Sequence, residues 1–216
     1  MKKSILYIGN KLASKGATAT TIDTLSFLFE GEGYTVYTAS SIKNKLFRFV
    51  DMLYATIKYS RKVSVVIIDT YSTQNFYYAL AVSWLCWIFK TPYIPILHGG
   101  NLPNRLSESP SLSKRLFGNA KTNVSPSKYL FEAFKARGYD NISYIPNSIE
   151  IDAYPFLLRN EISPRLLWVR SFAEIYNPML AVALLKTLKE KGIEATLTMV
   201  GPEKDGSLEA CKREAE

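Results

Sequence analysis

The feature that most constrains the fold is a regular alternation between two hydrophobic patterns. Short runs of consecutive apolar, often β-branched residues predict parallel strands that are covered on both faces. Longer segments with apolar residues three and four positions apart predict helices between those strands. The alternation therefore predicts an α/β fold with parallel sheets. The predicted strands are Ile5–Gly9, Tyr34–Ala39, Val63–Thr70, Pro92–His98, Thr122–Ser125, Ser143–Pro146, Leu166–Arg170 and Thr196–Gly201.

Helix signals fill the intervals between these strands. Helical spacing predicts a helix over about Thr18–Glu30, and the glycines that follow are expected to end it. Ser125 followed by Pro126 predicts an N-cap and a first helical residue, and Gly138 is expected to end that helix. The longest apolar run, Phe76–Phe89, is shorter than the ~20 residues that span a membrane, so it predicts a buried or interfacial helix.

The strand count predicts two domains. Helical and strand periodicity stop over residues 151–163, where Asp152 and Pro155 are typical of a linker. Residues 1–150 then form a Rossmann-like domain with six predicted strands, and residues 164–216 carry two. Because sheets usually contain ~4 to 6 strands, the second Rossmann-like domain is expected to be incomplete.

Charge and cysteine content limit the classes of partner. The formal net charge of +8 indicates attraction to phosphate-rich partners, which include nucleic acid, anionic lipid and nucleotide diphosphates. No nucleic-acid-binding module is recognisable, so nucleic acid is not an expected partner. Cys86 and Cys211 are far apart and indicate neither a disulfide framework nor a metal site. Together with the absence of a signal-peptide pattern, this predicts a cytoplasmic protein.

Short motifs occur in a fixed order along the chain. They are Lys15-Gly16, His98-Gly99-Gly100, Ser125-Pro126-Ser127, Ile145-Pro146-Asn147-Ser148-Ile149, Trp168-Val169-Arg170 and the weaker Met199-Val200-Gly201-Pro202. In this order and spacing, the sequence resembles the retaining glycosyltransferases of the GT-B type, the group with two Rossmann-like domains often called family 4. The resemblance implies transfer of a sugar, with retention, from a nucleotide diphosphate sugar to a glycan or lipid-linked acceptor. No permanently bound cofactor and no metal ion are expected.

The resemblance assigns catalytic roles to two residues. His98, the single histidine, would lie against the transferred sugar, and Gly99 and Gly100 would leave room for that sugar. Its position at the end of a predicted strand is where open α/β sheets bind ligands, although a structural histidine is the alternative. Arg170 would neutralise the leaving diphosphate, a role that suits a permanently charged donor. The family usually carries a lysine a few positions later, and residues 171–177 contain none.

Five further residues are candidates for binding substrates. Gly16 is predicted to lie between a strand and a helix N-terminus, where backbone N–H groups hold phosphate, and the alternative is a simple turn. Gly201 is a second candidate for the donor side. By resemblance Ser125, Ser127 and Asn147 line the cleft on the acceptor side, whereas a helix cap and a turn explain them without a ligand.

The segment Lys43–Lys62 is amphipathic, with apolar residues such as Leu46 and Leu53 on one helical face and basic residues such as Lys45 and Arg48 around the other. One interpretation is a helix that packs on the sheet with its basic side in water. The other is docking on an anionic membrane, which would make the protein peripheral at the inner face.

Other functions remain open at the level of sequence. A sugar-nucleotide epimerase or hydrolase shares this architecture, and a non-catalytic sugar- or lipid-binding module is a further alternative. The family places a carboxylate motif further along than Glu216. The 216-residue chain alone is therefore expected to be catalytically inactive.

Overall fold

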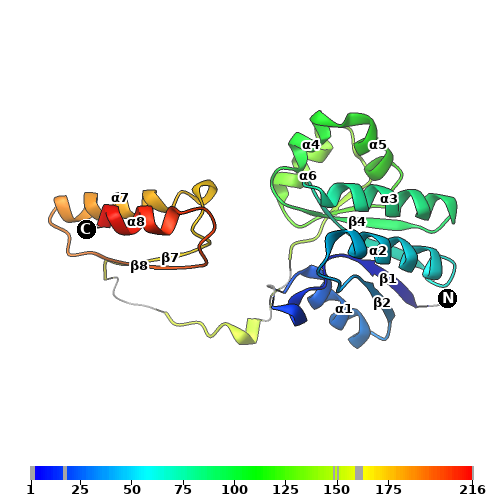
Figure 1. Cartoon of the computed structure of the whole chain (residues 1–216), viewed down its shortest axis with the longest axis horizontal. Coiled ribbons are helices and arrows are strands. Elements are labelled where there is room, and N and C mark those ends of the chain that lie inside the picture. The colour runs from blue at the N-terminus through cyan, green and yellow to red at the C-terminus, as the bar shows by residue number, and fades with distance from the viewer. Residues whose placement is uncertain (1–2, 17–18, 148, 150, 159–162, 216) are drawn as a thin grey trace. The chain divides into compact units, whose positions relative to one another are not determined.

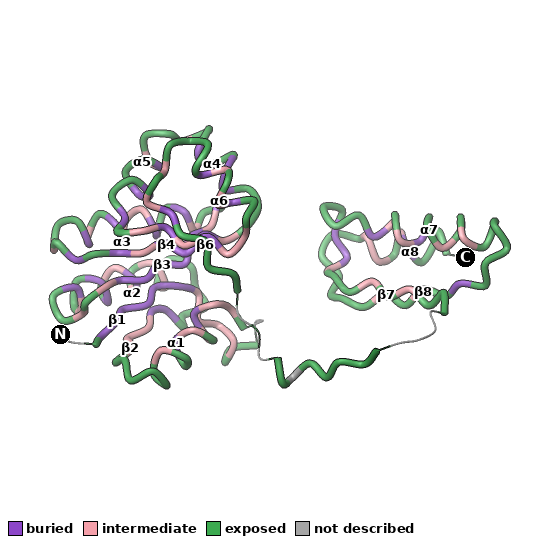
Figure 2. Tube along the Cα trace, turned by 180° about the vertical axis from the view of Figure 1, so that it is seen from behind, coloured by how far each residue is buried: buried purple, intermediate pink, exposed green. Residues whose placement is uncertain are grey.

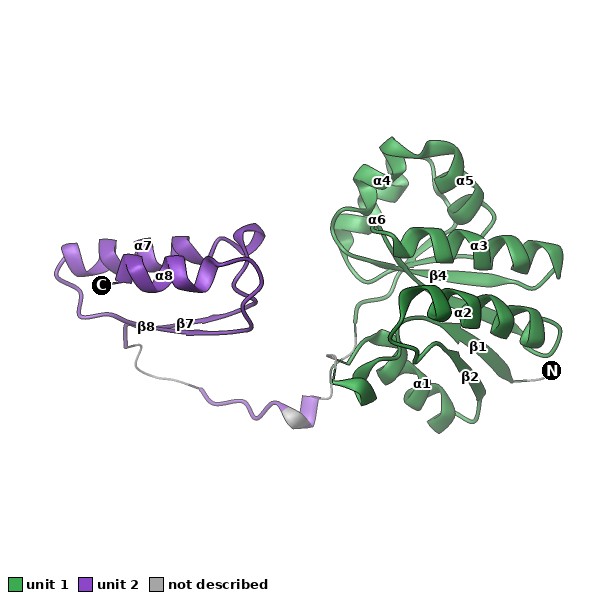
Figure 3. Ribbon diagram, viewed as in Figure 1, with its two compact units in different colours: residues 1–149 green, residues 150–216 purple. Residues whose placement is uncertain are grey.

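The computed structural model describes residues 3–16, 19–147, 149, 151–158 and 163–215. The chain divides into two compact units, residues 1–149 (unit 1) and residues 150–216 (unit 2), shown in Figure 3. Within the predicted linker, residues 151–153 form a short 3-10 helix, and residues 159–162 lie outside the described residues.

Unit 1 is built around a six-stranded parallel sheet with the order β2-β1-β3-β4-β5-β6 (Figure 1). The prediction of an α/β, Rossmann-like fold is confirmed, and each predicted strand corresponds to an observed one. The strands are β1 Ser4–Ile8, β2 Thr35–Ala39, β3 Val65–Tyr71, β4 Tyr93–His98, β5 Asn123–Ser125 and β6 Ile142–Tyr144.

Six α-helices connect these strands in the described part of unit 1. The helices α4 and α5, which are short and begin close to prolines, are absent from the predicted elements. The predicted helix start at Thr18 lies outside the described residues. The helices are α1 Thr21–Gly31, α2 Lys45–Tyr59, α3 Asn75–Ile88, α4 Leu102–Glu108, α5 Pro110–Gly118 and α6 Lys128–Lys135.

Alternate residues of the central strands pack into two different cores. In β1, Leu6 and Ile8 belong to a large cluster that contains residues of α2 to α6. Ile5 and Tyr7 belong to a smaller cluster with Ile22 of α1. Because side chains alternate between the two faces of a strand, α1 covers one face of the sheet and α2 to α6 cover the other. Connections between parallel strands are right-handed, so the face on which a helix lies depends on the direction in which the chain moves across the sheet. The chain reverses this direction after β2, and the later helices therefore lie on the other face.

The predicted cap of α6 is wrong by two residues. Ser127, not Ser125, is the N-cap, and its Oγ accepts a hydrogen bond from the backbone N–H of Leu130 at 3.2 Å. Ser125 is still the last residue of β5, because its backbone pairs with Tyr144 of β6. The strand therefore continues through the position that the Ser-Pro pattern assigned to the helix.

Unit 2 contains two parallel strands and two longer helices among its described residues. Phe172, Val182 and Cys211 form its buried core, and Trp168 and Met199 pack against them. The elements are β7 Arg165–Val169, the 3-10 helix η3 Glu174–Tyr176, α7 Pro178–Glu190, β8 Thr196–Val200 and α8 Ser207–Ala215.

None of the helices in the described part of the chain is long and apolar enough to cross a membrane.

Candidate functional site

The candidate site lies where the order of the sheet reverses. β1 lies between β2 and β3, and the chain leaves β1 and β3 in opposite directions across the sheet. Open parallel sheets bind ligands at the carboxyl ends of the strands beside such a switch point. At this edge Gly9 and Asn10 follow β1, Asp69 lies near the end of β3 and His98 ends β4.

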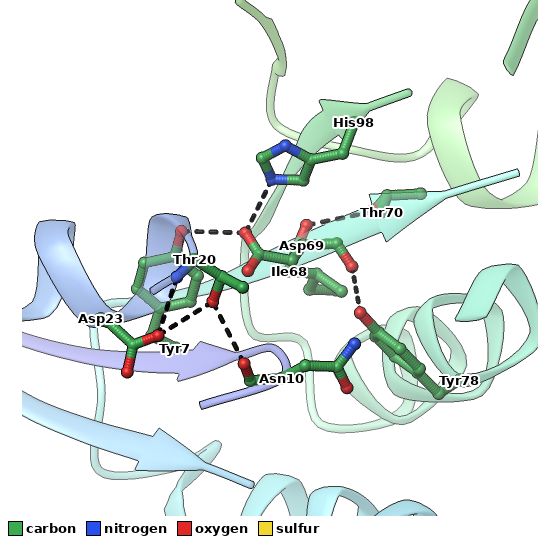
Figure 4. Close-up of polar contacts among 9 residues, drawn as sticks. All are labelled: Tyr7, Asn10, Thr20, Asp23, Ile68, Asp69, Thr70, Tyr78 and His98. Carbon is green, nitrogen blue, oxygen red and sulfur yellow. Dashed lines mark hydrogen bonds and ion pairs between the residues drawn. The ribbon is translucent and has the colours of Figure 1, made fainter. Parts of the chain in front are cut away.

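The buried carboxylate of Asp69 lies at the centre of this edge (Figure 4). The side chain of Asp69 is fully buried, and its Oδ1 accepts a hydrogen bond from the Tyr7 hydroxyl at 2.9 Å. The same oxygen lies 3.0 Å from Nε2 of His98. Burial, and then the charge of Asp69, raises the pKa of Tyr7, so the phenol keeps its proton and remains a donor.

The second carboxylate oxygen of Asp69 has no hydrogen-bond partner among the described residues, although it is buried. It lies against Gly9, where a Cβ would come within 2.5 Å of Oδ2. The side-chain oxygen of Asn10, the next residue, is also buried and without a described partner. Two buried acceptors therefore lie at the switch point, although buried polar atoms are normally paired.

The imidazole ring of His98 is held on two sides. The ring of Tyr71 stacks on it, with centroids 4.9 Å apart, and Asp69 accepts at Nε2. Because a carboxylate only accepts, Nε2 carries a hydrogen and Nδ1 is the nitrogen left for a ligand. After the ring, Gly99 adopts a positive φ of 84°, and a Cβ on Gly99 or Gly100 would meet no atom within 4 Å. The space next to Gly99 and Gly100 is therefore open.

Two side chains anchor the end of β3. The Tyr78 hydroxyl of α3 donates to the backbone oxygen of Asp69 at 2.6 Å. Arg105 of α4 donates from Nε and Nη2 to the backbone oxygen of Ser72, at 3.0 and 2.7 Å. These bonds fix the strand end on which the position of the carboxylate depends.

The predicted acceptor residues divide into two kinds. The hydroxyl of Ser125 is buried and donates to the backbone oxygen of Ser127 at 2.7 Å, and the hydroxyl of Ser127 caps α6. Both hydroxyls therefore serve the local backbone. Asn147 instead lines a pocket of about 330 Å³, together with Pro126 and Thr20. That pocket is on the α1 side of the sheet.

The predicted position of Gly16 at a helix N-terminus is wrong. Gly16 ends the 3-10 helix η1 Ala13–Lys15 with a φ of 86°, and α1 begins only at Thr21. The first turn of α1 carries Asp23, whose Oδ2 accepts from the backbone N–H of Thr20 at 2.9 Å. The positive end of this helix already has an anionic partner.

In unit 2, Arg170 and Gly201 follow the paired ends of β7 and β8. The backbones approach so closely that a Cβ on Gly201 would collide with the backbone oxygen of Arg170. The exposed guanidinium of Arg170 lies over the ring of Tyr176, 4.2 Å from its centroid. It forms no ion pair with a described residue, so its charge is available to an anion.

The fold of this chain resembles that of a solved enzyme structure. The crystal structure of a glycosyltransferase from Rickettsia africae ESF-5 matches 98% of this chain and 64% of its own, with a TM-score of 0.55 and 14% sequence identity. The chain shares its fold with a glycosyltransferase. It spans about two thirds of the length of that protein. No protein-family model matches the sequence, and no curated protein matches it.

Sequence reasoning located His98 and missed the residues that hold it. A lone aspartate within the apolar run Val65–Tyr71 was the available signal, because a charged residue in a buried strand needs a partner. Tyr7 is hidden as one more apolar residue of β1. Arg105 lies in a helix that was not predicted.

Proposed function

We propose that this chain contributes the acceptor side and part of the donor side of a retaining glycosyltransferase of the GT-B type. The reaction would move a sugar from a nucleotide diphosphate sugar to a hydroxyl of a glycan or lipid-linked acceptor. The main support is the pair Asp69–His98, which is fixed at the switch-point edge beside the open glycines 99 and 100. The fold shared with a glycosyltransferase is consistent with this proposal.

His98 is the residue that we place against the transferred sugar. Its Nδ1 presents a lone pair to a sugar hydroxyl when the ring is neutral and a donor when the ring is protonated. Asp69 acts through His98, because its hydrogen bond fixes the tautomer and the plane of the ring. Asp69 is therefore a positioning residue.

On the donor side, we place Arg170 at the leaving diphosphate. A guanidinium provides several donors in one plane and keeps its charge, which suits the negative charge that develops on the leaving group. The absence of a side chain at Gly201 lets the two strand ends close together beneath this arginine. Gly16 is a weaker candidate for donor binding, because it lies outside the first turn of α1.

We propose that the acceptor binds in the pocket of about 330 Å³ that Asn147 lines. The pocket has an apolar wall that includes Ile96 and Val124, and polar groups from Thr20 and Asn147. Such a lining suits a sugar ring, with one apolar face and hydroxyls at its edge. A lipid-linked acceptor would bring the protein to the inner face of a membrane.

Transfer assays on a full-length version of the protein with the single variants His98→Ala and Arg170→Ala would test these roles. Removal of one donor to a developing charge typically costs ~10²- to 10³-fold in rate, and we expect each variant to fall in that range with unchanged circular dichroism. Asp69→Asn should also lower the rate, because an amide side chain can either donate or accept at Nε2 and no longer fixes the tautomer of the ring. Wild-type turnover in either alanine variant would contradict the assignment. Release of free sugar without an acceptor would indicate a hydrolase instead.

A further inference from the structure

The outer faces of α2 and α3 form one continuous surface. The two helices lie side by side in both views (Figures 1 and 2). Near their carboxyl ends, the Thr91 hydroxyl donates to the backbone oxygen of Ser60 at 2.9 Å, and the guanidinium of Arg61 lies over the ring of Phe89. Near their amino ends, Lys45 and Tyr77 line the same pocket.

This surface exposes large aromatic and aliphatic side chains that the cores do not use. In α3, Trp84 is 51% exposed and Trp87 is 68% exposed. In α2, Phe47 is 64% exposed, and Tyr54 and Ile57 are exposed as well. Their neighbours Met52, Ala55, Ala79 and Cys86 are buried toward the sheet, so the exposed side chains point away from it. Exposed apolar groups gathered on one face, rather than scattered singly, indicate a contact surface.

The charges around these side chains are mostly positive. Residues 43–90 contain seven lysines and arginines and two aspartates. One of the aspartates is the buried Asp69, which leaves Asp51 as the acid near the surface. None of the seven cations forms an ion pair with a described residue. The Lys58 ammonium lies over the rings of Tyr54 and Tyr59, at 5.7 and 5.1 Å from their centroids, which joins the basic and aromatic groups.

A groove continues the surface at the carboxyl end of α3. A cavity of about 660 Å³ is lined by Trp87, Lys90 and Lys121, and a second of about 260 Å³ by Trp84, Trp87 and Arg115. Pro92 and Tyr93, which also line it, lie at the amino end of β4. The groove is therefore at the opposite edge of the sheet from His98. It combines indole rings with cations that have no described acidic partner, a lining that suits a phosphate joined to an apolar chain.

We propose that the outer face of α2 and α3 docks on a bilayer that contains anionic phospholipid, with Trp84 and Trp87 in the interfacial layer and the lysines on the headgroup phosphates. Tryptophan and tyrosine prefer the boundary between headgroups and hydrocarbon. A rim with seven basic residues and one acid near the surface, Asp51, complements an anionic lipid surface better than it complements a second copy of the same basic face. This surface is distinct from the site at Asp69 and His98, so the proposal does not depend on the transfer reaction.

Vesicle sedimentation with the full chain tests the proposal. We expect binding to phosphatidylcholine vesicles with about one third phosphatidylglycerol, weak binding to pure phosphatidylcholine, and release by salt. The double variant Lys45→Glu/Lys62→Glu should weaken binding by roughly tenfold or more, since each basic residue near an anionic surface contributes about fivefold to the affinity. Trp84→Ser/Trp87→Ser should weaken it by at least roughly tenfold, because aromatic area stays in water.

Matched controls separate this surface from charge and hydrophobicity in general. Lys186→Glu/Lys189→Glu on α7 changes the net charge equally, and Phe27→Ser removes a 72% exposed ring from α1 on the other face of the sheet. Both should bind like the wild type, and all variants should keep their urea midpoints. Equal binding to neutral and anionic vesicles would overturn the proposal. So would control variants that lose as much vesicle binding as the variants on α2 and α3. So would a stable dimer in lipid-free solution that the tryptophan variant dissociates.

Discussion

Units 1 and 2 are both built from alternating strands and helices, but the strands of unit 1 are more deeply buried than those of unit 2. Every residue of β1 is buried, whereas β7 alternates between exposed and half-buried residues, as the tube in Figure 2 shows. In unit 1, helices cover both faces of the sheet. In the described part of unit 2, Trp168 faces the helices and Leu167 is 68% exposed on the other side. An apolar run therefore predicts a strand, and the layers around that strand decide how much of it is buried.

The largest expected difference between the units concerns their cores. Phe117→Ala in α5 removes a fully buried ring that packs against Phe76 and Phe134, and we expect a loss of about 3–5 kcal/mol from the free energy of unfolding of unit 1. Phe172→Ala should cost unit 2 less, because its buried cluster holds three residues.

Tryptophan fluorescence in urea separates the two signals. A Trp168→Phe background reports on unit 1 through Trp84 and Trp87, and Trp84→Phe/Trp87→Phe reports on unit 2. If Phe117→Ala and Phe172→Ala lower the free energy of unfolding equally, the core of unit 2 is as well packed as that of unit 1.

A smaller difference is expected at alkaline pH. Burial raises the pKa of Tyr7 and Tyr78 well above 10.0, and burial together with the charge of Asp69 raises the pKa of Tyr71 to about 12. Above the ordinary tyrosine pKa, these phenols ionise only in the unfolded chain, which then binds fewer protons than the folded chain. The stability of unit 1 should therefore be complete below pH ~10 and fall as the pH rises, by up to ~1.4 kcal/mol per pH unit for each such tyrosine.

The measurement is the urea midpoint between pH 8 and 11, taken as rough limits of the tyrosine range, with the two fluorescence backgrounds. Unit 2 has no buried tyrosine among its described residues, so its midpoint should change less. The variant Tyr7→Phe should flatten the alkaline slope of unit 1. A slope that is the same in both units would contradict the assignment to buried tyrosines.

The smallest expected effect is on the exposed face of β7. Leu167→Thr places a β-branched residue, which suits a strand, at an exposed position, and we expect a change in the free energy of unfolding within about 0.5 kcal/mol. The matched variant Ile67→Thr in β3 places a hydroxyl in the core under α1, and it should cost several times more. A comparable loss at Leu167 would mean that this face is covered in solution.

Strand positions could be predicted from the sequence because each strand is a short apolar run bounded by turn residues. The observed ends differ from the predicted ones by only a few residues at most, as at Val63–Thr70 against β3 Val65–Tyr71. The helices α4 and α5 could not be predicted in the same way. They are short, Pro110 begins the second, and polar residues interrupt their apolar spacing.

The candidate site was predicted less completely than the fold. The carboxyl end of a buried strand located His98, since that edge is common to all parallel strands. Its partner Asp69 is 29 residues away in the chain, and the contact depends on the register that places Tyr71 opposite His98. Apolar patterning does not determine the register between two strands that are buried on both faces.

The close packing of Gly9 on Asp69 has a consequence for sequence change at these two positions. A Cβ at position 9 would be 2.5 Å from Oδ2, so a larger residue there is tolerated only if position 69 becomes shorter or its side chain turns away. Substitutions at 9 and 69 should therefore be strongly non-additive. Among homologues that keep this sheet, the two positions are expected to covary, and a paired library at 9 and 69 would recover folded combinations that neither single-site library contains.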